Sequence, residues 1–203
     1  LKQNLRHPPY IDFPMKVHAA DIDADGDVDL VTGSRFYLAW HENMNRNGTN
    51  WTTHIVGETT GSLTRRTSHA NPQAVDIDGD GDLDLVFSEF IGKVGYFLNL
   101  DGKGTFGSLH FVGTSDKSAT MVAADFDGDG DIDLSTASKN GEIVMFENID
   151  GEGTFGPRQI VWELSADEVP YIKCADIDSD GDLDLVSASR TGSSGLLAWH
   201  KNN

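Results

Sequence analysis

Asp125-Phe126-Asp127-Gly128-Asp129-Gly130-Asp131-Ile132-Asp133, a stretch of alternating aspartates, occurs in four versions along this chain of 203 residues. The other versions begin at Asp21, Asp76 and Asp176, so the four starts lie 55, 49 and 51 residues apart. We call these nonapeptides aspartate loops 1 to 4 and number their positions 1 to 9. A self-similar period near 50 residues indicates a repeat architecture.

The aspartate loops have the composition of a calcium site. Carboxylates at positions 1, 3, 5 and 9 converge when the chain wraps once around a point, and the glycine at position 6 permits the sharp turn because glycine accepts positive φ. Hard oxygen ligands at this spacing suit Ca²⁺, which takes about 6–8 oxygens. Position 7 is expected to offer its backbone carbonyl, with its side chain toward solvent. An acidic surface turn is the alternative, but close carboxylate pairs repel by about 4 kcal/mol at an effective dielectric near 20.

We therefore predict up to four Ca²⁺ ions, one per repeat. The predicted ligands are the five aspartates of each loop: Asp21, Asp23, Asp25, Asp27 and Asp29; Asp76, Asp78, Asp80, Asp82 and Asp84; Asp125, Asp127, Asp129, Asp131 and Asp133; and Asp176, Asp178, Asp180, Asp182 and Asp184.

The residues after each loop separate this pattern from an EF-hand. An EF-hand needs a glutamate at position 12 and flanking helices, whereas position 12 here is Thr32, Phe87, Thr136 or Ser187. The runs that follow the loops are short and rich in small and β-branched residues, which is typical of strands. Each loop is therefore expected to join two strands.

Composition restricts the class of partner. Net charge is −18, and the four loops hold 20 of the 33 acidic residues, so the rest of the chain carries 15 basic and 13 acidic residues. Nucleic acid is an unfavourable partner because no basic stripe is available to neutralise phosphates. No run approaches the ~20 apolar residues of a membrane span. The chain begins at Leu1 rather than Met, which is typical of a processed or excised product. The single cysteine, Cys174, is expected to be a small buried strand residue; the alternative is a reactive thiol.

Strand patterns recur with the same period. We expect strands at 15–20, 28–34, 37–43 and 51–56; at 72–75, 83–89, 94–99 and 106–112; at 119–124, 132–138, 143–148 and 155–162; and at 170–175, 183–189 and 196–202. The turn Asp101-Gly102-Lys103-Gly104-Thr105-Phe106-Gly107 returns almost unchanged at 150–156. Four strands per repeat of about 50 residues predict an all-β fold, a β-propeller of four blades.

The whole chain is predicted to be one repeat domain. Its blades span about 11–56, 57–112, 113–162, and 163–203 together with 1–10. The last repeat lacks a fourth strand, and residues 2–10 resemble what should follow Asn202. We expect this N-terminal segment to complete the last blade or the blade of a neighbouring chain, because its prolines suit an edge strand. A closed four-blade ring, half of a two-chain ring and a piece of a longer array all remain open, and the matched termini favour the closed ring.

The aspartate loops, the Asn-x-Asp-Gly-x-Gly-x-Phe-Gly turns (99–107 and 148–156) and the Trp-His-x-Asn strands (40–43 and 199–202) together resemble FG-GAP/VCBS-type repeats. These are the calcium-loop blades of integrin α-subunits, fungal propeller lectins and many secreted or surface proteins. The resemblance covers nearly the whole chain and implies Ca²⁺ between the first two strands of each blade. The Gly-Ala-Pro element of the integrin version is absent, so integrin-like partner binding is not carried over.

The expected function is a non-catalytic, calcium-stabilised extracellular or cell-surface scaffold for binding or adhesion to a protein or glycan. The alternatives are a carbohydrate-binding lectin, a structural unit that assembles through its termini as a homo-oligomer or tandem array, and an accessory portion of a larger polysaccharide-active enzyme. Specificity is expected in the unrepeated segments 57–71, 163–169 and 190–195. No nucleophile-elbow, zinc-protease or phosphate-loop motif is present, although unrepeated residues such as Arg65, Arg66 and His69 leave an enzyme open.

The tryptophans and the strand histidines have two interpretations. Exposed tryptophans at 40, 51, 162 and 199 would favour a lectin, whereas Trp40 and Trp199 recur at one strand position and are expected in the core. His41 and His200 are expected to be hydrogen-bonded strand residues rather than ligands.

Overall fold

The computed structural model describes residues 16–34, 36–59, 70–163 and 168–202. Within these residues the chain forms fifteen strands and no helix, which confirms the all-β prediction. No helix of the described part is therefore long and apolar enough to cross a membrane. The predicted strand at residues 2–10 and the residues Arg65, Arg66 and His69 lie outside the described residues.

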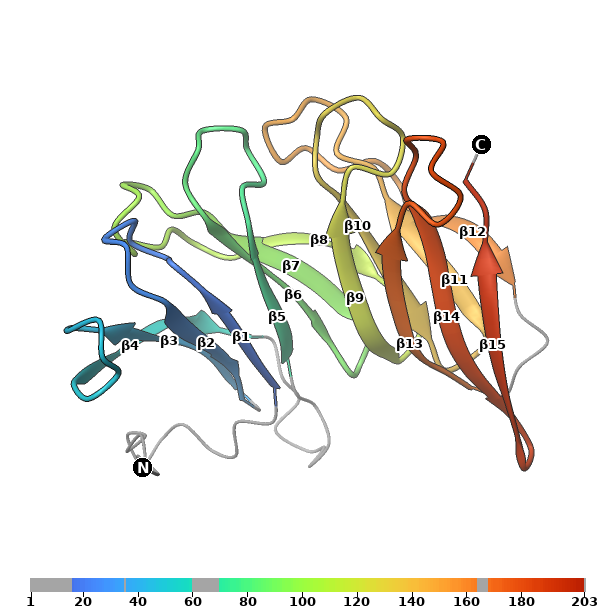
Figure 1. Ribbon diagram of the computed structural model, residues 1–203, viewed down its shortest axis with the longest axis horizontal. Coiled ribbons are helices and arrows are strands. Elements are labelled where there is room, and N and C mark those ends of the chain that lie inside the picture. The colour runs from blue at the N-terminus through green and yellow to red at the C-terminus, as the bar shows by residue number, and fades with distance from the viewer. Residues whose placement is uncertain (1–15, 35, 60–69, 164–167, 203) are drawn as a thin grey trace. The chain divides into compact units, whose positions relative to one another are not determined.

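The strands form four sheets of consecutive strands (Figure 1). The first holds β1 (Lys16–Ala20), β2 (Asp29–Gly33), β3 (Tyr37–Asn43) and β4 (Trp51–Glu58). The second holds β5 (Ala70–Val75), β6 (Asp84–Glu89), β7 (Lys93–Phe97) and β8 (His110–Thr114). The third holds β9 (Ser118–Ala124), β10 (Asp133–Ser138), β11 (Glu142–Phe146) and β12 (Gln159–Glu163). The fourth holds β13 (Glu168–Ala175), β14 (Asp184–Thr191) and β15 (Ser194–His200).

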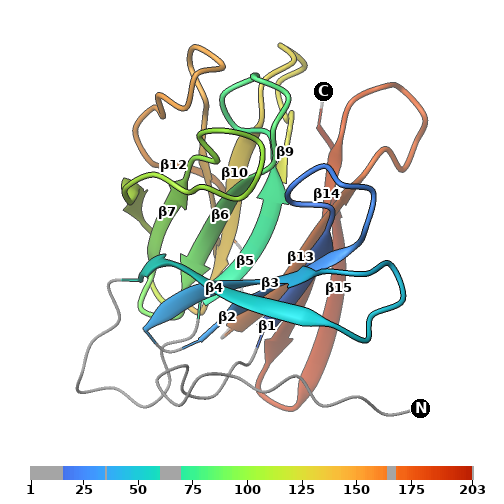
Figure 2. The same cartoon turned by 90° about the vertical axis from the view of Figure 1, so that its left-hand side faces the viewer.

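Each sheet is a series of antiparallel hairpins in chain order. β3 and β4, for example, run side by side in Figure 2 into the loop that joins them (cyan). The four sheets correspond to the four predicted repeats, with three strands in the last one. This arrangement is propeller-like, since each repeat is a small antiparallel sheet with sequential strands.

Two predicted strands begin later than expected. The fourth strands of repeats 2 and 3 were predicted from Phe106 and Phe155, but β8 and β12 start at His110 and Gln159. Phe106 and Phe155 instead make isolated bridges to Asn99 and Asn148. The N–H of Gly107 donates to the Leu98 carbonyl at 2.8 Å, which closes the turn before the strand resumes.

The chain divides into two compact units, each with its own core. Among the described residues, the first unit comprises 16–34, 36–59, 70–76, 80–89 and 95–110, and its core includes Ile22, Val31, Leu38, Trp40, Ala70, Leu85, Phe87 and Phe97. The second comprises 77–79, 90–94, 111–163 and 168–202, and its core includes Val122, Ala124, Phe126, Ala137, Ile143, Ile172 and Leu185. Each core joins residues of successive repeats, as expected for repeats that cannot bury their faces alone.

A glycine in the fourth strand of one repeat makes room for an aromatic ring of the next repeat. A Cβ on Gly57 of β4 would lie 2.4 Å from the ring of Phe97, and a Cβ on Gly113 of β8 would lie 2.5 Å from the ring of Phe146. Both distances are far below carbon–carbon contact. The glycines therefore allow the third strand of each following repeat to pack closely.

Candidate metal centres

Strand register brings the two ends of every aspartate loop together. The residue just before position 1 pairs with the aspartate at position 9: Ala20 with Asp29, Val75 with Asp84, Ala124 with Asp133, and Ala175 with Asp184. Each loop is therefore the connection between the first two strands of its sheet, as predicted. In Figure 1 the four loops are the bends between β1 and β2, β5 and β6, β9 and β10, and β13 and β14.

Three carboxylates converge in each loop. The aspartates at positions 1, 3 and 9 each offer an oxygen, and these oxygens lie within 4.8 Å of one another in all four loops. The four groups are Asp21, Asp23 and Asp29; Asp76, Asp78 and Asp84; Asp125, Asp127 and Asp133; and Asp176, Asp178 and Asp184. We call each group a carboxylate triad.

Position 1 also folds the loop around itself. Its carboxylate accepts the N–H of the glycine at position 6 in every loop, at 3.0 Å from Gly26, Gly81 and Gly130 and at 3.2 Å from Gly181. These glycines have φ between +88° and +104°, a range that L-residues with side chains rarely adopt. The predicted need for glycine at position 6 is confirmed.

Position 5 lies outside the triads. Asp25, Asp80, Asp129 and Asp180 each use one carboxylate oxygen to accept the N–H of position 7, at 2.8–3.1 Å. A carboxylate oxygen has more than one lone pair, so this bond does not prevent coordination. Ligation by position 5 stays a prediction.

Position 7 differs from expectation in the first loop. The Asp27 side chain is 5% exposed, and the prediction that it faces solvent is wrong there. Its carboxylate accepts the Arg46 N–H at 2.7 Å and pairs with Arg46 Nε at 3.0 Å. A Cβ on Gly102 or Gly151 would lie about 2.5 Å from the carboxylates of Asp82 or Asp131. In repeats 1, 2 and 3 the aspartate at position 7 therefore lies against the turn between the third and fourth strands. In repeat 4 the corresponding residue, Asp182, is exposed.

Position 9 is the most buried carboxylate of each triad, at 0–1% exposure. In repeat 3, Asp133 accepts the N–H of Asn148 at 2.8 Å and the N–H of Phe126 at 3.1 Å. Burial raises the pKa of Asp133 to about 6, against the two hydrogen bonds, which lower it. Such an anion is costly in the absence of a compensating cation.

The other triad pKa values follow the same physics. Burial, followed by the neighbouring Asp25 carboxylate, raises the pKa of Asp23, and burial raises the pKa of Asp29 and of Asp127. At Asp184, burial is outweighed by hydrogen bonds from Asn202, Ile177 and Trp199, which lower its pKa. The donor set of each triad is three carboxylates without nitrogen or sulfur, which fits a hard divalent cation such as Ca²⁺.

The asparagine after each third strand was not predicted to have a role. Its side-chain Nδ2 donates to the carbonyl at position 2 of the preceding aspartate loop: Asn99 to Ile22 at 3.1 Å, Asn148 to Ile77 at 3.0 Å and Asn202 to Phe126 at 2.6 Å. We call these bonds asparagine ties. The recurrence of Asn43, Asn99, Asn148 and Asn202 in the sequence was the signal for them.

In the first repeat the corresponding asparagine keeps only a bond to its own loop, which Asn99 also makes, to the Leu83 carbonyl at 3.3 Å. Asn43 donates Nδ2 to Val28 of its own loop at 3.3 Å, and its buried Oδ1 has no hydrogen-bond partner. The Oδ1 atoms of Asn99 and Asn148 accept the N–H groups of Gly104 and Gly153. Gly48 follows Asn43 by five residues, as Gly104 follows Asn99, but its N–H does not bond the Oδ1 of Asn43.

The paired tryptophans do not share one environment. Trp40 is 3% exposed, as predicted for a core residue, and donates Nε1 to Asp29 at 3.1 Å. Gly104 of the next repeat lies directly against its ring. Trp199 is 49% exposed, because no such turn follows it in the described residues. The core prediction therefore fails for Trp199.

The strand histidines are hydrogen-bonded, as predicted. His41 is fully buried and contacts the hydroxyls of Thr32 and Thr53, both at 2.9 Å. His200 contacts the Ser187 hydroxyl at 2.8 Å, and burial lowers its pKa.

Cys174 is half-buried at the edge of the second core, and burial raises the pKa of its thiol.

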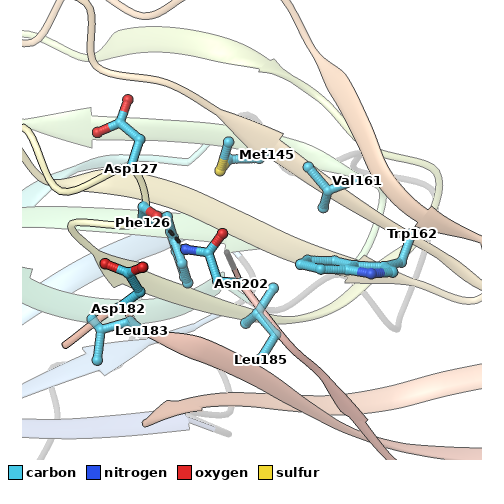
Figure 3. Close-up of a pocket in the computed structure, with 9 residues that line it drawn as sticks. All are labelled: Phe126, Asp127, Met145, Val161, Trp162, Asp182, Leu183, Leu185 and Asn202. Carbon is cyan, nitrogen blue, oxygen red and sulfur yellow. Dashed lines mark hydrogen bonds between the residues drawn. The ribbon is translucent and has the colours of Figure 1, made fainter. Parts of the chain in front are cut away.

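A pocket of about 240 Å³ lies in the second unit between residues of repeats 3 and 4. In Figure 3 the carboxylates of Asp127 and Asp182 lie toward one side of the view, the Trp162 indole lies on the other, and the Asn202 amide lies between them. Its apolar lining comes from Phe126, Met145, Val161, Leu183 and Leu185. Trp162 is one of the four tryptophans named above as candidate lectin contacts, whereas its particular amide and carboxylate neighbours could not be assigned from the sequence.

Comparison with known proteins agrees with this geometry. A family model described as the FG-GAP-like repeat matches residues 21–87, 76–136 and 125–187, which cover most of the chain. The chain therefore belongs to the FG-GAP-like repeat family, as its motifs indicated. A search of curated proteins finds no match.

Two solved structures are similar in fold. The Vibrio cholerae biofilm matrix protein Bap1 is 20% identical with a TM-score of 0.55, over 91% of this chain and 26% of Bap1. An Agrocybe aegerita lectin, described as specifically recognising non-reducing terminal N-acetylglucosamine, is 20% identical with a TM-score of 0.58, over 90% of this chain and 52% of the lectin. At this identity the likeness concerns the fold alone. The chain spans about a quarter of one neighbour and about half of the other.

Proposed function

We propose that this chain is a non-catalytic, calcium-stabilised extracellular β-propeller scaffold for binding or adhesion. The observation that carries the proposal is the fourfold carboxylate triad, which stands at the connection between the first two strands of every sheet. Each triad gathers three acidic side chains in one place, and a bound cation would offset their repulsion. A site present in every repeat serves the scaffold, whereas an active site is normally unique.

Calcium would be held by the triad, with positions 5 and 7 adding oxygens at its rim. When bound, Ca²⁺ supplies charge neutralisation and cross-links the ends of the loop. Extracellular calcium modules bind with dissociation constants of about 10⁻⁴–10⁻³ M. At tenfold excess over that constant each site adds about 1.4 kcal/mol, so four sites add about 5–6 kcal/mol. Affinities of this kind require the high calcium concentration of an extracellular compartment.

Thermal unfolding in 5 mM Ca²⁺, in chelator and in Mg²⁺ tests the proposal. Calcium should raise the melting temperature by at least about 10 °C, since 1 kcal/mol corresponds to about 2–4 °C for a domain of this size. Magnesium should act weakly because it dehydrates reluctantly and demands strict octahedral geometry. A melting temperature that is indifferent to chelator would refute calcium stabilisation.

A lectin is the second candidate, and the pocket around Trp162 favours it. The indole offers an apolar face for a sugar ring, and Asn202 and Asp127 offer polar groups beside it. The fungal neighbour is described as a lectin, which supports the idea without assigning a sugar to this chain. Binding of the purified protein to a glycan panel, with calcium, should be lost in Trp162→Ala and kept in Trp51→Ala. Silence of the folded wild-type protein on the panel would leave the protein-binding scaffold.

We also propose that residues 2–10 complete the last blade as its fourth strand. The fourth sheet has three strands among the described residues, and Leu197 of β15 is 75% exposed. Deletion of residues 1–10 should therefore lower the melting temperature and increase the exposure of β15. Unchanged hydrogen exchange of the β15 amides after the deletion would contradict this assignment.

A further inference from the structure

The residue just before each asparagine differs in charge among the repeats. It is Glu42 in repeat 1, Leu98 in repeat 2, Glu147 in repeat 3 and Lys201 in repeat 4. In repeats 1, 3 and 4 this residue acts on the aspartate at position 3 of its own loop. Glu42 acts electrostatically on Asp23, and Glu147 acts on Asp127. Lys201 contacts the carboxylate of Asp178 directly.

Lys201 is a tethered cation at the fourth triad. Its ammonium group contacts Asp178 and lies 3.1 Å from Asp180 Oδ2, so it bridges positions 3 and 5 of loop 4. In loops 1 and 3, no lysine or arginine of the described residues contacts a carboxylate of the triad. The nearest case is Arg46 in repeat 1, which pairs with Asp27 at position 7 and lies outside the triad.

We propose that this residue sets the order in which loops 1, 3 and 4 fill with calcium, and that Lys201 makes loop 4 the weakest of these three sites. The inference rests on the proposed calcium binding and adds a ranking to it. A Ca²⁺ ion in loop 4 must displace the ammonium group from Asp178 or remain beside it, and either costs binding energy. Lys201 is 41% exposed, so screening is strong, and the expected weakening is about tenfold rather than thousandfold.

Loop 3 is the strongest site by the same reasoning. Glu147 adds negative charge near Asp127, and Asp150 adds negative charge near Asp131. In loop 1 the charge of Glu42 is shared with His54 at 2.7 Å and opposed by Arg46. The predicted order of filling is therefore loop 3, then loop 1, then loop 4.

The position-6 glycines allow each loop to be observed separately. The N–H groups of Gly26, Gly81, Gly130 and Gly181 each bond the position-1 carboxylate of their own triad. Their amide resonances in a two-dimensional ¹⁵N NMR titration with CaCl₂ should report the occupancy of each loop. We expect the Gly181 resonance to convert at a calcium concentration about tenfold higher than that of Gly130.

Charge exchange at one strand position then tests the cause. Lys201→Met should lower the Gly181 midpoint about tenfold, and Lys201→Glu should lower it further, toward that of Gly130. Glu147→Lys should raise the Gly130 midpoint about tenfold. Lys173→Met is the matched control, because Lys173 lies in the same repeat, on the exposed face of β13, and the substitution removes the same charge. This control should move the Gly181 midpoint less than threefold.

The outcomes separate the two proposals. If no glycine resonance responds up to 10 mM calcium, the proposed calcium function itself is wrong. If the resonances of Gly26, Gly130 and Gly181 respond with one midpoint, or if Lys201→Met behaves as Lys173→Met, calcium binds but the ranking by Lys201 is wrong. The inference is supported if the Gly181 midpoint lies at a higher calcium concentration than those of Gly26 and Gly130, and if Lys201→Glu lowers it toward theirs.

Discussion

The asparagine tie of repeat 3 yields a prediction whose size follows from its bonds. Asn148 is fully buried, donates Nδ2 to the Ile77 carbonyl at 3.0 Å and accepts the Gly153 N–H at 3.2 Å. Asn148→Ala removes both side-chain bonds but keeps the backbone N–H that bonds Asp133. Each buried group that loses a partner costs about 1–3 kcal/mol, so the free energy of unfolding should fall by about 2–6 kcal/mol.

Asn43→Ala is the matched control for this substitution. Asn43 stands at the same motif position, but its Oδ1 has no hydrogen-bond partner and its Nδ2 makes one bond of 3.3 Å within its own repeat. Its removal should cost no more than about 1.5 kcal/mol. Calorimetry in saturating calcium should therefore give a loss in melting temperature of about 4–24 °C for Asn148→Ala and a clearly smaller loss for Asn43→Ala. Equal losses would refute the view that the tie stabilises successive repeats.

Three further predictions concern a turn and two titrating groups. Gly104→Ala should destabilise the protein by more than about 3 kcal/mol in a chemical denaturation assay, because the φ of Gly104 is +82° and the new Cβ would lie 2.2 Å from Trp40. Gly192→Ala is the control: its φ is +57° and the space around it is open, so it should cost about 1–2 kcal/mol. In saturating calcium, the free energy of unfolding should fall as the pH drops below about 6.5. Burial lowers the pKa of His200 in the folded state, so the unfolded chain binds the proton first. Parallel plots of unfolding free energy against pH for the wild type and His200→Phe would contradict this. Without calcium, burial raises the pKa of folded Asp133 from 3.8 to about 6, so the folded state binds this proton more tightly than the unfolded state. The free energy of unfolding should therefore fall by up to about 3 kcal/mol as the pH rises from 4 to 6. Asp133→Asn should not show this fall.

The repeats, loops and most strands could be predicted because their signals are local. Alternating aspartates with a glycine at position 6 fix the shape of a loop within nine residues, and strand side chains alternate with a period of two. The predicted strand 37–43 matches β3 as found. The triad followed from the same local spacing, since position 9 pairs with the residue just before position 1.

The features that were missed depend on contacts between distant residues. The partner of Asn148 at Ile77 is 71 residues away, and no local pattern indicates such a bond. Asp27 is buried because the turn 44–50 of repeat 1, which supplies Arg46, differs from the glycine turns of repeats 2 and 3. Trp40 and Trp199 share a motif but differ in exposure, because burial depends on what the next repeat places over the ring.

The asparagine ties also bear on how such a chain can change its length in evolution. Each tie runs from one repeat to the loop before it, so a segment of one period, here 49–55 residues, carries one donor and one acceptor. Duplication or deletion of a segment cut at matching points leaves every new junction with the same bond. Asn43, which makes the bond to its own loop but no tie to another loop, shows that a repeat without the tie can still fold. Recombination between repeats can therefore lengthen or shorten the array without redesign of its junctions.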